Sequence, residues 1–280
     1  MIFKRSKDRA LLEDILSRVA RIESTTNFFY DDLELSRQGI NLFALAEQLV
    51  LERDSEDFKK VFGLNSPKVS VIIPISRKIE ILKVSIQSVL SQTHKNLELI
   101  LVSESPREDV IQFLSELNDN RIKFILNYPF TNATGTWTRW ALSGGKSRTL
   151  GMRSASGDFF TFLDDDDEMM PNKLADCVEF AKSNSYEVVG HLNGIQDNGV
   201  LKPLRLDKVN KTRYFLGGGV DYFGLGSNTI FLHKFFLPIA WPLYNYKNLR
   251  GNDSVFVRMI FALNPNYGLL SKILTIKNEN

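Results

Sequence analysis

Four consecutive carboxylates, Asp164 to Asp167, directly follow an apolar run in this chain. The run, residues 159–163, has the composition of a buried β-strand. Four adjacent like charges repel one another and resist burial, and a divalent cation bound at the end of the strand would account for them. Mg²⁺ and Mn²⁺ prefer carboxylate oxygens and leave coordination positions open for the phosphates of a substrate. The simpler alternative is a solvated acidic turn before the helix that is expected from Pro171.

The composition is that of a globular protein without a dedicated nucleic-acid surface. The chain has 280 residues, 43% of them hydrophobic and 24% charged, and its net charge is +2. Its one cysteine, Cys177, excludes an internal disulfide and fits a reducing compartment. The sequence shows neither an apolar run as long as a membrane span nor a secretory signal. We therefore expect a cytoplasmic protein.

Residues 1–66 have a helical hydrophobic pattern and form the first of two predicted regions. One apolar stripe comprises Leu12, Ile15, Val19, Ile22 and Phe29, and a second comprises Leu42, Leu45, Ala46, Leu49 and Val50, continued by Phe58, Val61 and Phe62. Three interpretations stay open: helices packed on the main domain, a short coiled coil that forms a homo-oligomer, or peripheral contact of the basic N-terminus with the inner face of a membrane.

Residues 67–280 alternate between strand and helix patterns, which predicts an α/β fold. Strands are expected at 69–73, 97–102, 122–126, 159–163 and 187–192, and helices at 79–92, 106–118, 146–155 and 171–182. Near-continuous apolar strands between helices predict a mostly parallel sheet that is covered on both faces. Ligands bind at the carboxyl ends of such strands, where Pro74, Ser103-Glu104 and the four acids all fall.

Several motifs in order give the chain a specific resemblance. They are Val-Ser-Val-Ile-Ile-Pro (69–74), Ser-Val-Leu-Ser-Gln-Thr-His-Lys-Asn-Leu-Glu-Leu-Ile-Leu-Val (88–102), Lys-Ser-Arg-Thr-Leu-Gly-Met-Arg-Ser-Ala-Ser-Gly-Asp (146–158) and Phe-Leu-Asp-Asp-Asp-Asp-Glu-Met-Met-Pro (162–171). The chain resembles a family 2 glycosyltransferase with the Rossmann-like GT-A fold. The resemblance implies a metal-assisted, inverting transfer of a sugar from a nucleotide sugar, expected to be a UDP-sugar, to an acceptor hydroxyl. It also implies Mn²⁺ or Mg²⁺ as cofactor and a glycan, lipid-linked or protein acceptor, as in surface polysaccharide or glycan synthesis.

The resemblance assigns roles to individual residues. It implies contacts with the nucleotide sugar for Pro74, Ile75, Ser76, Glu104, Arg148, Asp164 and Asp165, and metal ligation for Asp166. Asp167 would orient the site or cap the following helix.

A single-displacement inversion needs one general base that takes the proton of the acceptor hydroxyl. Asp253 matches the acid that the family places at a helix start, with Asn252 in place of the preceding acid. The alternative is that Asp253 only stabilises the first turn of a helix through Phe261. Residues expected on the acceptor side are Asp221, Asn228, Trp241 and His191, and Asp221 is the second candidate for the base.

Two other function classes remain open. A sugar-nucleotide nucleotidyltransferase also uses a doubly wound sheet and a metal, but it needs a glycine-rich phosphate loop, and Pro74-Ile75-Ser76-Arg77 has no glycine. A non-catalytic sugar-binding or assembly subunit is compatible with Ser103, Thr149 and Asn252, which depart from the family pattern. Asp164, Asp166 and Asp253 favour an enzyme.

Overall fold

The computed structural model describes residues 42–103, 107–126, 144–197, 200–204, 215–216, 220–221, 225–239, 241 and 252–278. The helices described are α2 (Leu42–Arg53), α3 (Glu56–Gly63), α4 (Ile79–Leu90), α5 (Glu108–Leu117), α7 (Gly145–Ser154), α8 (Lys173–Asn184) and α9 (Asn252–Ala262), with 3-10 turns η1 (Ser227–Thr229) and η2 (Lys234–Phe236). The strands described are β1 (Val69–Ile75), β2 (Leu97–Ser103), β3 (Ile122–Leu126), β4 (Phe159–Phe162), β5 (Glu168–Met169), β6 (Val188–Asp197), β7 (Val200–Pro203), β8 (Phe215–Leu216), β9 (Val220–Asp221), β10 (Ile230–His233) and β11 (Tyr267–Ile276).

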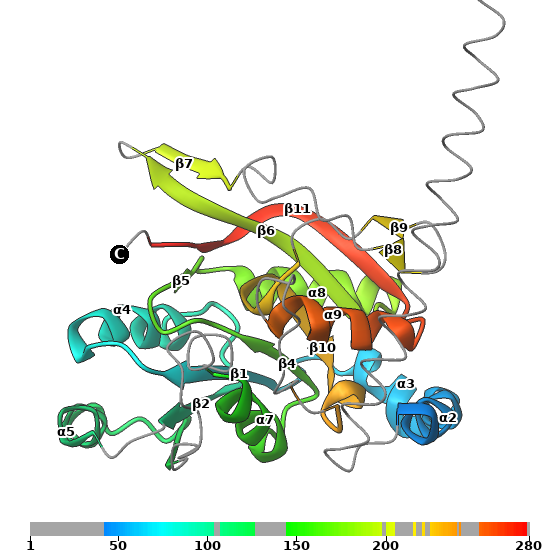
Figure 1. Ribbon diagram of the computed structural model, residues 1–280, viewed down its shortest axis with the longest axis horizontal. Helices are drawn as coiled ribbons and strands as arrows, with labels where there is room; N and C mark the ends of the chain where they lie inside the picture. The colour runs from blue at the N-terminus through cyan, green and yellow to red at the C-terminus, as the bar shows by residue number, and fades with distance from the viewer. Residues whose placement is uncertain are drawn as a thin grey trace, which may run out of the picture.

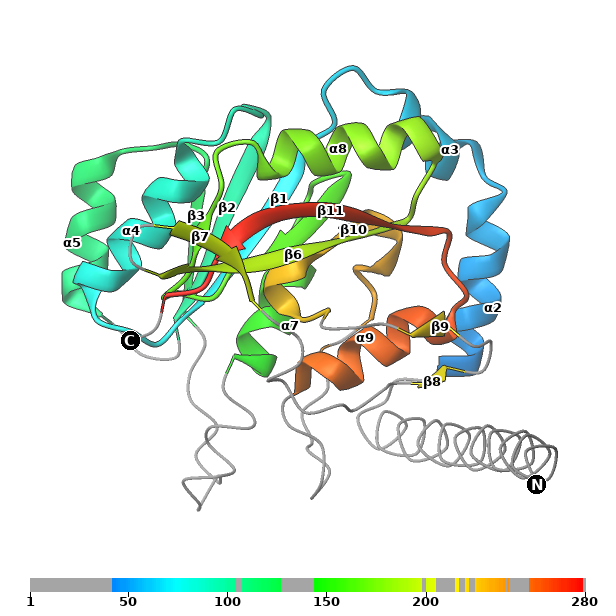
Figure 2. The ribbon, with the colours of Figure 1, turned by 90° about the horizontal axis from the view of Figure 1, so that it is seen from above.

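One sheet organises the described part of the chain, with strand order β3-β2-β1-β4-β10-β6-β11-β5 and β7 paired to β6. Strands β3, β2, β1 and β4 are parallel, as the alternation of strands and helices predicts. Strand β10 then lies antiparallel between β4 and β6, while β11 is parallel to β6 (Figure 2). The predicted α/β architecture is confirmed, but the second half of the sheet is mixed because β10 and β5 run against their neighbours.

Two hydrophobic clusters cover the faces of the sheet. Alternate residues of β1 point to opposite faces, so Ile72 packs with Met152 of α7 and Phe256 of α9, while Val71 and Ile73 pack with α4, α5 and α8. Figure 1 shows α4 and α7 on opposite sides of β1 and β2. Gly151 allows α7 to lie close to the sheet, because a Cβ there would approach Ile72 Cγ2 to 2.4 Å.

This topology brings distant segments to one edge of the sheet. Strands β1, β2 and β4 end there, at Ile75, Ser103 and Phe162. Strand β11 pairs antiparallel with β5, which directly follows the four acids, so the residues after β11 also reach this edge. The carboxyl ends of β1, β2 and β4 lie at the same edge of the sheet, as predicted, and the end of β11 also lies there.

The helices α2 and α3 pack on the main domain. Val61 is buried, Phe62 stacks on the ring of His233 at 5.4 Å between ring centroids, and Arg53 of α2 forms an ion pair with Glu187 at 2.8 Å. Of the second apolar stripe, Phe58, Val61 and Phe62 on α3 pack on the main domain, whereas Val50 on α2 is exposed. The first stripe lies outside the described residues, so homo-oligomer formation, membrane contact and the domain boundary after residue 66 stay predictions.

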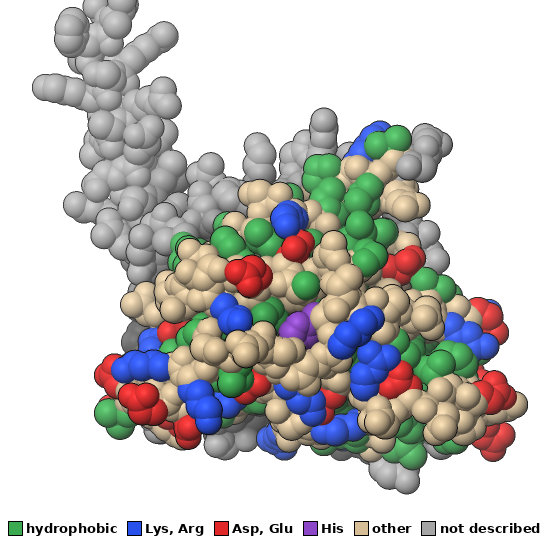
Figure 3. Space-filling model, turned by 180° about the vertical axis from the view of Figure 1, so that it is seen from behind, with side chains coloured by type: hydrophobic (Ala, Val, Ile, Leu, Met, Phe, Trp, Pro, Cys, Tyr) green, Lys and Arg blue, Asp and Glu red, His purple; other side chains and the backbone are tan. Residues whose placement is uncertain are grey.

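The surface is mixed in character. Figure 3 shows acidic and basic side chains interspersed on one face, with hydrophobic side chains gathered over the β6–β7 end of the sheet. Leu192 and Val200 are exposed at that end. Among the described helices, none combines the length and the hydropathy that crossing a membrane requires.

Candidate active site

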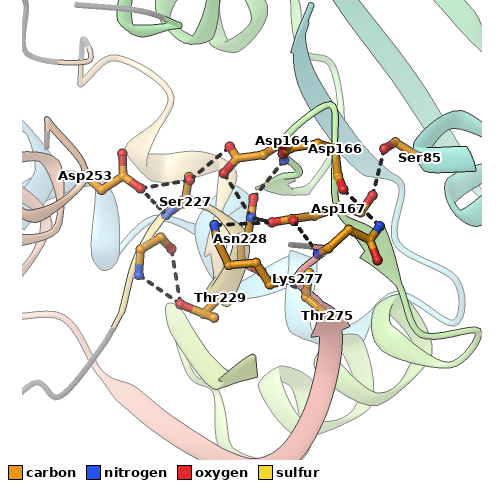
Figure 4. Close-up of polar contacts among 12 residues, drawn as sticks. Ser85, Asp164, Asp166, Asp167, Ser227, Asn228, Thr229, Asp253, Thr275 and Lys277 are labelled. Atoms are coloured by element: carbon orange, nitrogen blue, oxygen red, sulfur yellow. Dashed lines mark hydrogen bonds and ion pairs between the residues drawn. The ribbon is translucent and has the colours of Figure 1, made fainter. Parts of the chain in front are cut away.

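The four acids form a tight turn after β4. The amide of Asp167 donates to the carbonyl of Asp164 at 3.2 Å, which closes the turn. One carboxylate oxygen from each of Asp164, Asp166 and Asp167 lies within 4.8 Å of the others. Figure 4 shows the three side chains together with Ser227, Asn228 and Asp253. The turn brings these three carboxylates close together, but each of them has different hydrogen-bond and ion-pair partners.

Asp164 is held by groups from two elements, the helix α7 and the 3-10 turn η1. Its Oδ1 accepts a hydrogen bond from Nη2 of Arg148 at 2.6 Å, and its Oδ2 accepts one from the amide of Asn228 at 3.1 Å. The backbone amide of Asp164 in turn donates to Oδ1 of Asn228 at 2.8 Å. The side chain of Asp164 is 27% exposed, so its oxygens remain accessible to a ligand.

Asp165 points toward the loop after β1. Its Oδ2 accepts hydrogen bonds from the backbone amides of Ser76 and Arg77, each at 2.5 Å. Burial raises the pKa of this carboxyl group, although the two amide donors oppose the shift. Asp165 thus fixes the loop that the resemblance places along the nucleobase; its direct contact with the donor stays a prediction.

Asp166 is partly exposed and forms an ion pair with the half-exposed side chain of Arg77. Oδ2 of Asp166 lies 2.9 Å from Nη2 of Arg77, whose side chain is 51% exposed. An exposed ion pair of this kind contributes little stability and can be replaced by another cation. A ligand cation could therefore displace Arg77 from Asp166 at little cost in stability.

Asp167 is fully buried, and its side chain makes hydrogen bonds that hold the acid turn against neighbouring segments. Its carboxylate accepts hydrogen bonds from the side-chain amide of Asn228 and, at 3.2 Å, from the backbone amide of Asn278. Nζ of Lys277 lies 3.7 Å away. Burial raises the pKa of Asp167 to about 7, with Lys277 opposing and the neighbouring Asp164 and Asp166 adding to the shift.

Two lysines supply positive charge around the turn. Burial alone would lower the pKa of Lys277, but the carboxylates of Asp167, Asp164 and Asp166 raise it. Lys173 at the start of α8 is fully buried, and burial lowers its pKa to about 8. Its ammonium group donates to the carbonyl of Asn228 at 2.9 Å and to Oγ1 of Thr275 at 3.1 Å. Lys173 therefore holds in place the residue that binds both Asp164 and Asp167.

Asp253 lies in the first turn of α9 and reaches the same group of side chains through Ser227. Its Oδ2 accepts two hydrogen bonds from Ser227, one from Oγ at 2.9 Å and one from the backbone amide at 3.1 Å. The same hydroxyl is 3.4 Å from Oδ1 of Asp164. One serine side chain thus separates the candidate base from the acid turn.

Arg148 and Trp241 form a second connection between the acid turn and α9. The guanidinium carbon of Arg148 lies 4.9 Å from the centre of a Trp241 ring, which in turn stacks on Phe256 of α9 at 4.2 Å. Trp241 is 1% exposed. Its ring therefore supports Arg148 and the core, while stacking on an acceptor sugar stays a prediction.

The remaining predicted residues lie less close to the acids or cannot be placed. His191 is buried in β6, where burial lowers its pKa well below the ordinary value. The backbone of Asp221 lies in β9, but its side chain is not among those described. Glu104 lies outside the described residues. Pro74 and Ile75 end β1 and place Ser76 beside Asp165.

The donor groups fit a hard divalent cation. They are carboxylate oxygens, Asp164 and Asp166 are partly exposed, and the cluster includes no thiolate or imidazole ligand among the described residues. Asp167 fits less well, because its oxygens already bind Asn228 and Asn278. Asp166, with Asp164 beside it, is the residue that would hold the ion.

Sequence reasoning missed several residues of this site: Ser227, Lys173, Lys277 and Asn278. Ser227 and Asn228 lie in a 3-10 turn whose sequence, Gly-Ser-Asn-Thr, gives only a turn signal. Lys277 and Asn278 follow β11, a strand that had not been predicted. A buried lysine such as Lys173 cannot be told from an exposed helical lysine by sequence alone.

Comparisons with known proteins agree on one family and one fold. The family model for glycosyl transferase family 2 matches residues 70–237. The GalNAc(5)-diNAcBac-PP-undecaprenol beta-1,3-glucosyltransferase of Campylobacter jejuni is 34% identical over 128 residues, which cover 45% of this chain and 38% of that protein. The Escherichia coli UDP-Glc:alpha-D-GlcNAc-diphosphoundecaprenol beta-1,3-glucosyltransferase WfgD is 28% identical over 177 residues, 62% of this chain and 64% of that protein.

Among solved structures, Staphylococcus aureus TarS 1-349 in complex with UDP-GlcNAc superposes with a TM-score of 0.56 at 21% identity, covering 76% of this chain and 59% of that one. At this identity the likeness establishes the fold alone. The chain spans less than two thirds of the length of each of these relatives.

Proposed function

Because this chain belongs to glycosyl transferase family 2, we propose that it transfers a sugar from a nucleotide sugar to an acceptor hydroxyl with inversion at the anomeric carbon. The observation that carries the proposal is the position of Asp253, which shares the Ser227 hydroxyl with Asp164 of the acid turn. The acids proposed to bind the donor, Asp164 and Asp166, thus lie next to the candidate base, Asp253, but are separate residues from it. A site that only bound sugars would not need this separation of roles.

The proposed donor is a UDP-sugar. Asp165 fixes the backbone of Ser76 and Arg77, so the loop expected along the nucleobase is rigid where it meets the acids. Arg148 is oriented by Asp164 and lies at the same edge of the sheet. The UDP-GlcNAc complex of TarS, which has the same fold, is in keeping with a uridine nucleotide but does not identify the sugar.

In the proposed reaction, a bound Mg²⁺ or Mn²⁺ would stabilise the negative charge that develops on the diphosphate as it leaves. Asp166 would hold the ion, with Asp164 beside it. Asp253 takes the proton of the acceptor hydroxyl while the acceptor oxygen forms its bond to the anomeric carbon. The bond from that carbon to the phosphate oxygen breaks, and the nucleoside diphosphate leaves with the electron pair.

The proposed acceptor is a glycan on a polyprenyl diphosphate carrier, in the synthesis of a surface polysaccharide or other glycan. The support is the printed activity of two relatives, both of which act on undecaprenol-linked diphosphates. An acceptor of this kind is anchored in a membrane, so the proposal places the enzyme at the cytoplasmic membrane surface. The match to these relatives covers only part of each, and the acceptor must therefore be tested directly.

A donor panel is the first test. Transfer from UDP-glucose, UDP-GlcNAc, UDP-galactose and a GDP-sugar to a short-chain polyprenyl-diphosphate glycan should be measured with and without Mn²⁺. We expect one UDP-sugar to be used and the activity to disappear with a chelator. Asp166→Asn should remove Mn²⁺-dependent UDP binding, whereas Asp176→Asn, which breaks an ion pair between α8 and Lys272 of β11, should not. Unchanged Mn²⁺-dependent UDP affinity in Asp166→Asn would refute the metal assignment.

A further inference from the structure

The contacts of Asp253 are unevenly divided between its two oxygens. Oδ2 accepts both hydrogen bonds from Ser227, at 2.9 Å from the hydroxyl and 3.1 Å from the backbone amide. Within the described part of the chain, no hydrogen bond reaches Oδ1. Among the described residues, the side chain is thus anchored through one oxygen, which leaves the other uncommitted.

Ser227 is itself rigidly placed. It opens the 3-10 turn η1, is 2% exposed, and is followed by Asn228, which binds Asp164 and Asp167. Before it, the backbone of Gly226 lies so close that a Cβ there would be 3.3 Å from Oδ2 of Asp253. The donor groups of Ser227 are therefore set by the same turn that holds the acid cluster.

The Ser227 hydroxyl has one hydrogen and two carboxylates within reach. It lies closer to Asp253 Oδ2, at 2.9 Å, than to Asp164 Oδ1, at 3.4 Å, and Asp164 Oδ1 already accepts a hydrogen bond from Arg148. The hydrogen of the hydroxyl therefore points to Asp253. Hydrogen bonds to a carboxylate are directional, so this arrangement fixes the rotation of the Asp253 side chain.

We propose that Ser227 is a positioning residue for Asp253, which it holds through Oδ2 so that Oδ1 receives the proton of the acceptor hydroxyl. The inference rests on the proposed role of Asp253 as general base and adds to it the reacting atom and the residue that orients it. Once Oδ1 carries the proton, Asp253 is neutral and attracts the hydroxyl less strongly. The hydroxyl can then turn toward Oδ1 of Asp164.

A double-mutant cycle tests this inference. Single-turnover transfer at saturating donor should be measured for the wild type, Ser227→Ala, Asp253→Asn and the double variant. Losing one hydrogen bond to a charged group should slow transfer by Ser227→Ala about 10- to 100-fold while the affinity for UDP changes less than about threefold. Ser227→Ala should cause no further loss in the Asp253→Asn background, because there is no base left to position.

The control residue is Ser70, a serine near the start of β1 whose hydroxyl also donates to a carboxylate. Ser70 is also buried, and its hydroxyl donates to the carboxylate of Glu98 at 2.6 Å. Ser70→Ala should lower stability but leave the rate of transfer by the folded protein unchanged. If Ser227→Ala fails to fold, Ser227→Cys is nearly isosteric, provides only a weak donor, and undergoes the same cycle.

The outcomes separate this inference from the proposed function. If Asp253→Asn transfers at the normal rate, the base assignment is wrong and Ser227 has nothing to position. If Asp253→Asn is slow but Ser227→Ala slows both backgrounds by the same factor, Ser227 acts independently of Asp253 and the inference fails. It fails equally if Ser227→Ala transfers normally or loses UDP affinity in proportion to its rate.

Discussion

Arg77 and Asp166 form an ion pair across the entrance of the acid turn, with 2.9 Å between Nη2 and Oδ2. The arginine thus occupies the oxygen that would bind a divalent cation. Asp165 fixes the backbone of the same arginine, so the side chain can leave Asp166 without moving the loop. Binding of a metal ion must therefore compete with Arg77 for this carboxylate.

The first prediction follows from this competition. Arg77→Gln should raise the affinity of the donor-free protein for Mn²⁺ by up to about fivefold, since a half-exposed ion pair contributes at most about 1 kcal/mol. Titration calorimetry or the paramagnetic signal of free Mn²⁺ measures the change. Arg121→Gln, which removes the same charge from a pair with Asp119 at the start of β3, is the control. Weaker Mn²⁺ binding by Arg77→Gln would contradict the competition between the ion and Arg77 for Asp166.

A second prediction concerns acid stability. Glu98 in β2 is almost fully buried, and burial would raise its pKa, but hydrogen bonds from Lys123, Ser70, Ser156 and Lys68 lower it from 4.5 to about 2. A carboxyl group with a lower pKa in the folded state stabilises the fold above pH 4.5, and this contribution is lost as the pH falls toward 2. Glu98→Gln should lower the free energy of unfolding at pH 7 by about 1–3 kcal/mol.

Urea unfolding between pH 7 and pH 2 measures this effect. The difference between wild type and Glu98→Gln should shrink as the pH falls through the window from 4.5 to about 2. Glu116→Gln on the exposed side of α5 should leave the curve unchanged. A difference that is independent of pH would mean that the loss comes from packing and not from the charge of Glu98.

A third prediction concerns helix α3. Phe62→Ala should lower the free energy of unfolding by about 2 kcal/mol or more, because the ring packs against His233 and Phe159. The rate of transfer by the folded fraction should not change, since the residues of α3 do not contact the acid turn within the described structure. Unchanged stability together with a slower rate would instead make α3 part of the active site.

The sequence predicted the first half of the fold well, because β1, β2 and β4 are buried runs rich in apolar residues and the helices between the strands have amphipathic patterns. It did not predict β10 or β11. The run Ile230–His233 is only four residues long, and Tyr267–Ile276 mixes exposed and buried positions without regular alternation, because its pairing with β6 contains two register shifts. Such irregular strands depend on tertiary pairing that a local pattern does not contain.

In the candidate site, too, residues within sequence motifs were predicted and residues placed by long-range contacts were not. Arg148, Asp164 and Asp166 belong to contiguous motifs, and the structure brings them together as expected. Ser227 and Lys277 belong to no motif, and their role arises only because η1 and the end of β11 fold back on the acid turn. Their contribution depends on long-range contacts, so sequence spacing could not indicate it.

The most direct test of the account is transfer by Asp253→Asn. The substitution preserves size and the hydrogen bond from Ser227 but cannot take a proton, so single-turnover transfer at saturating donor should fall about a hundredfold or more. UDP affinity should stay within about twofold, because Asp253 is separated from the donor acids by Ser227. Asp221→Asn, the second candidate for the base, should retain transfer. Near-normal transfer by Asp253→Asn, with or without a loss in Asp221→Asn, would contradict the assignment of Asp253 as the general base.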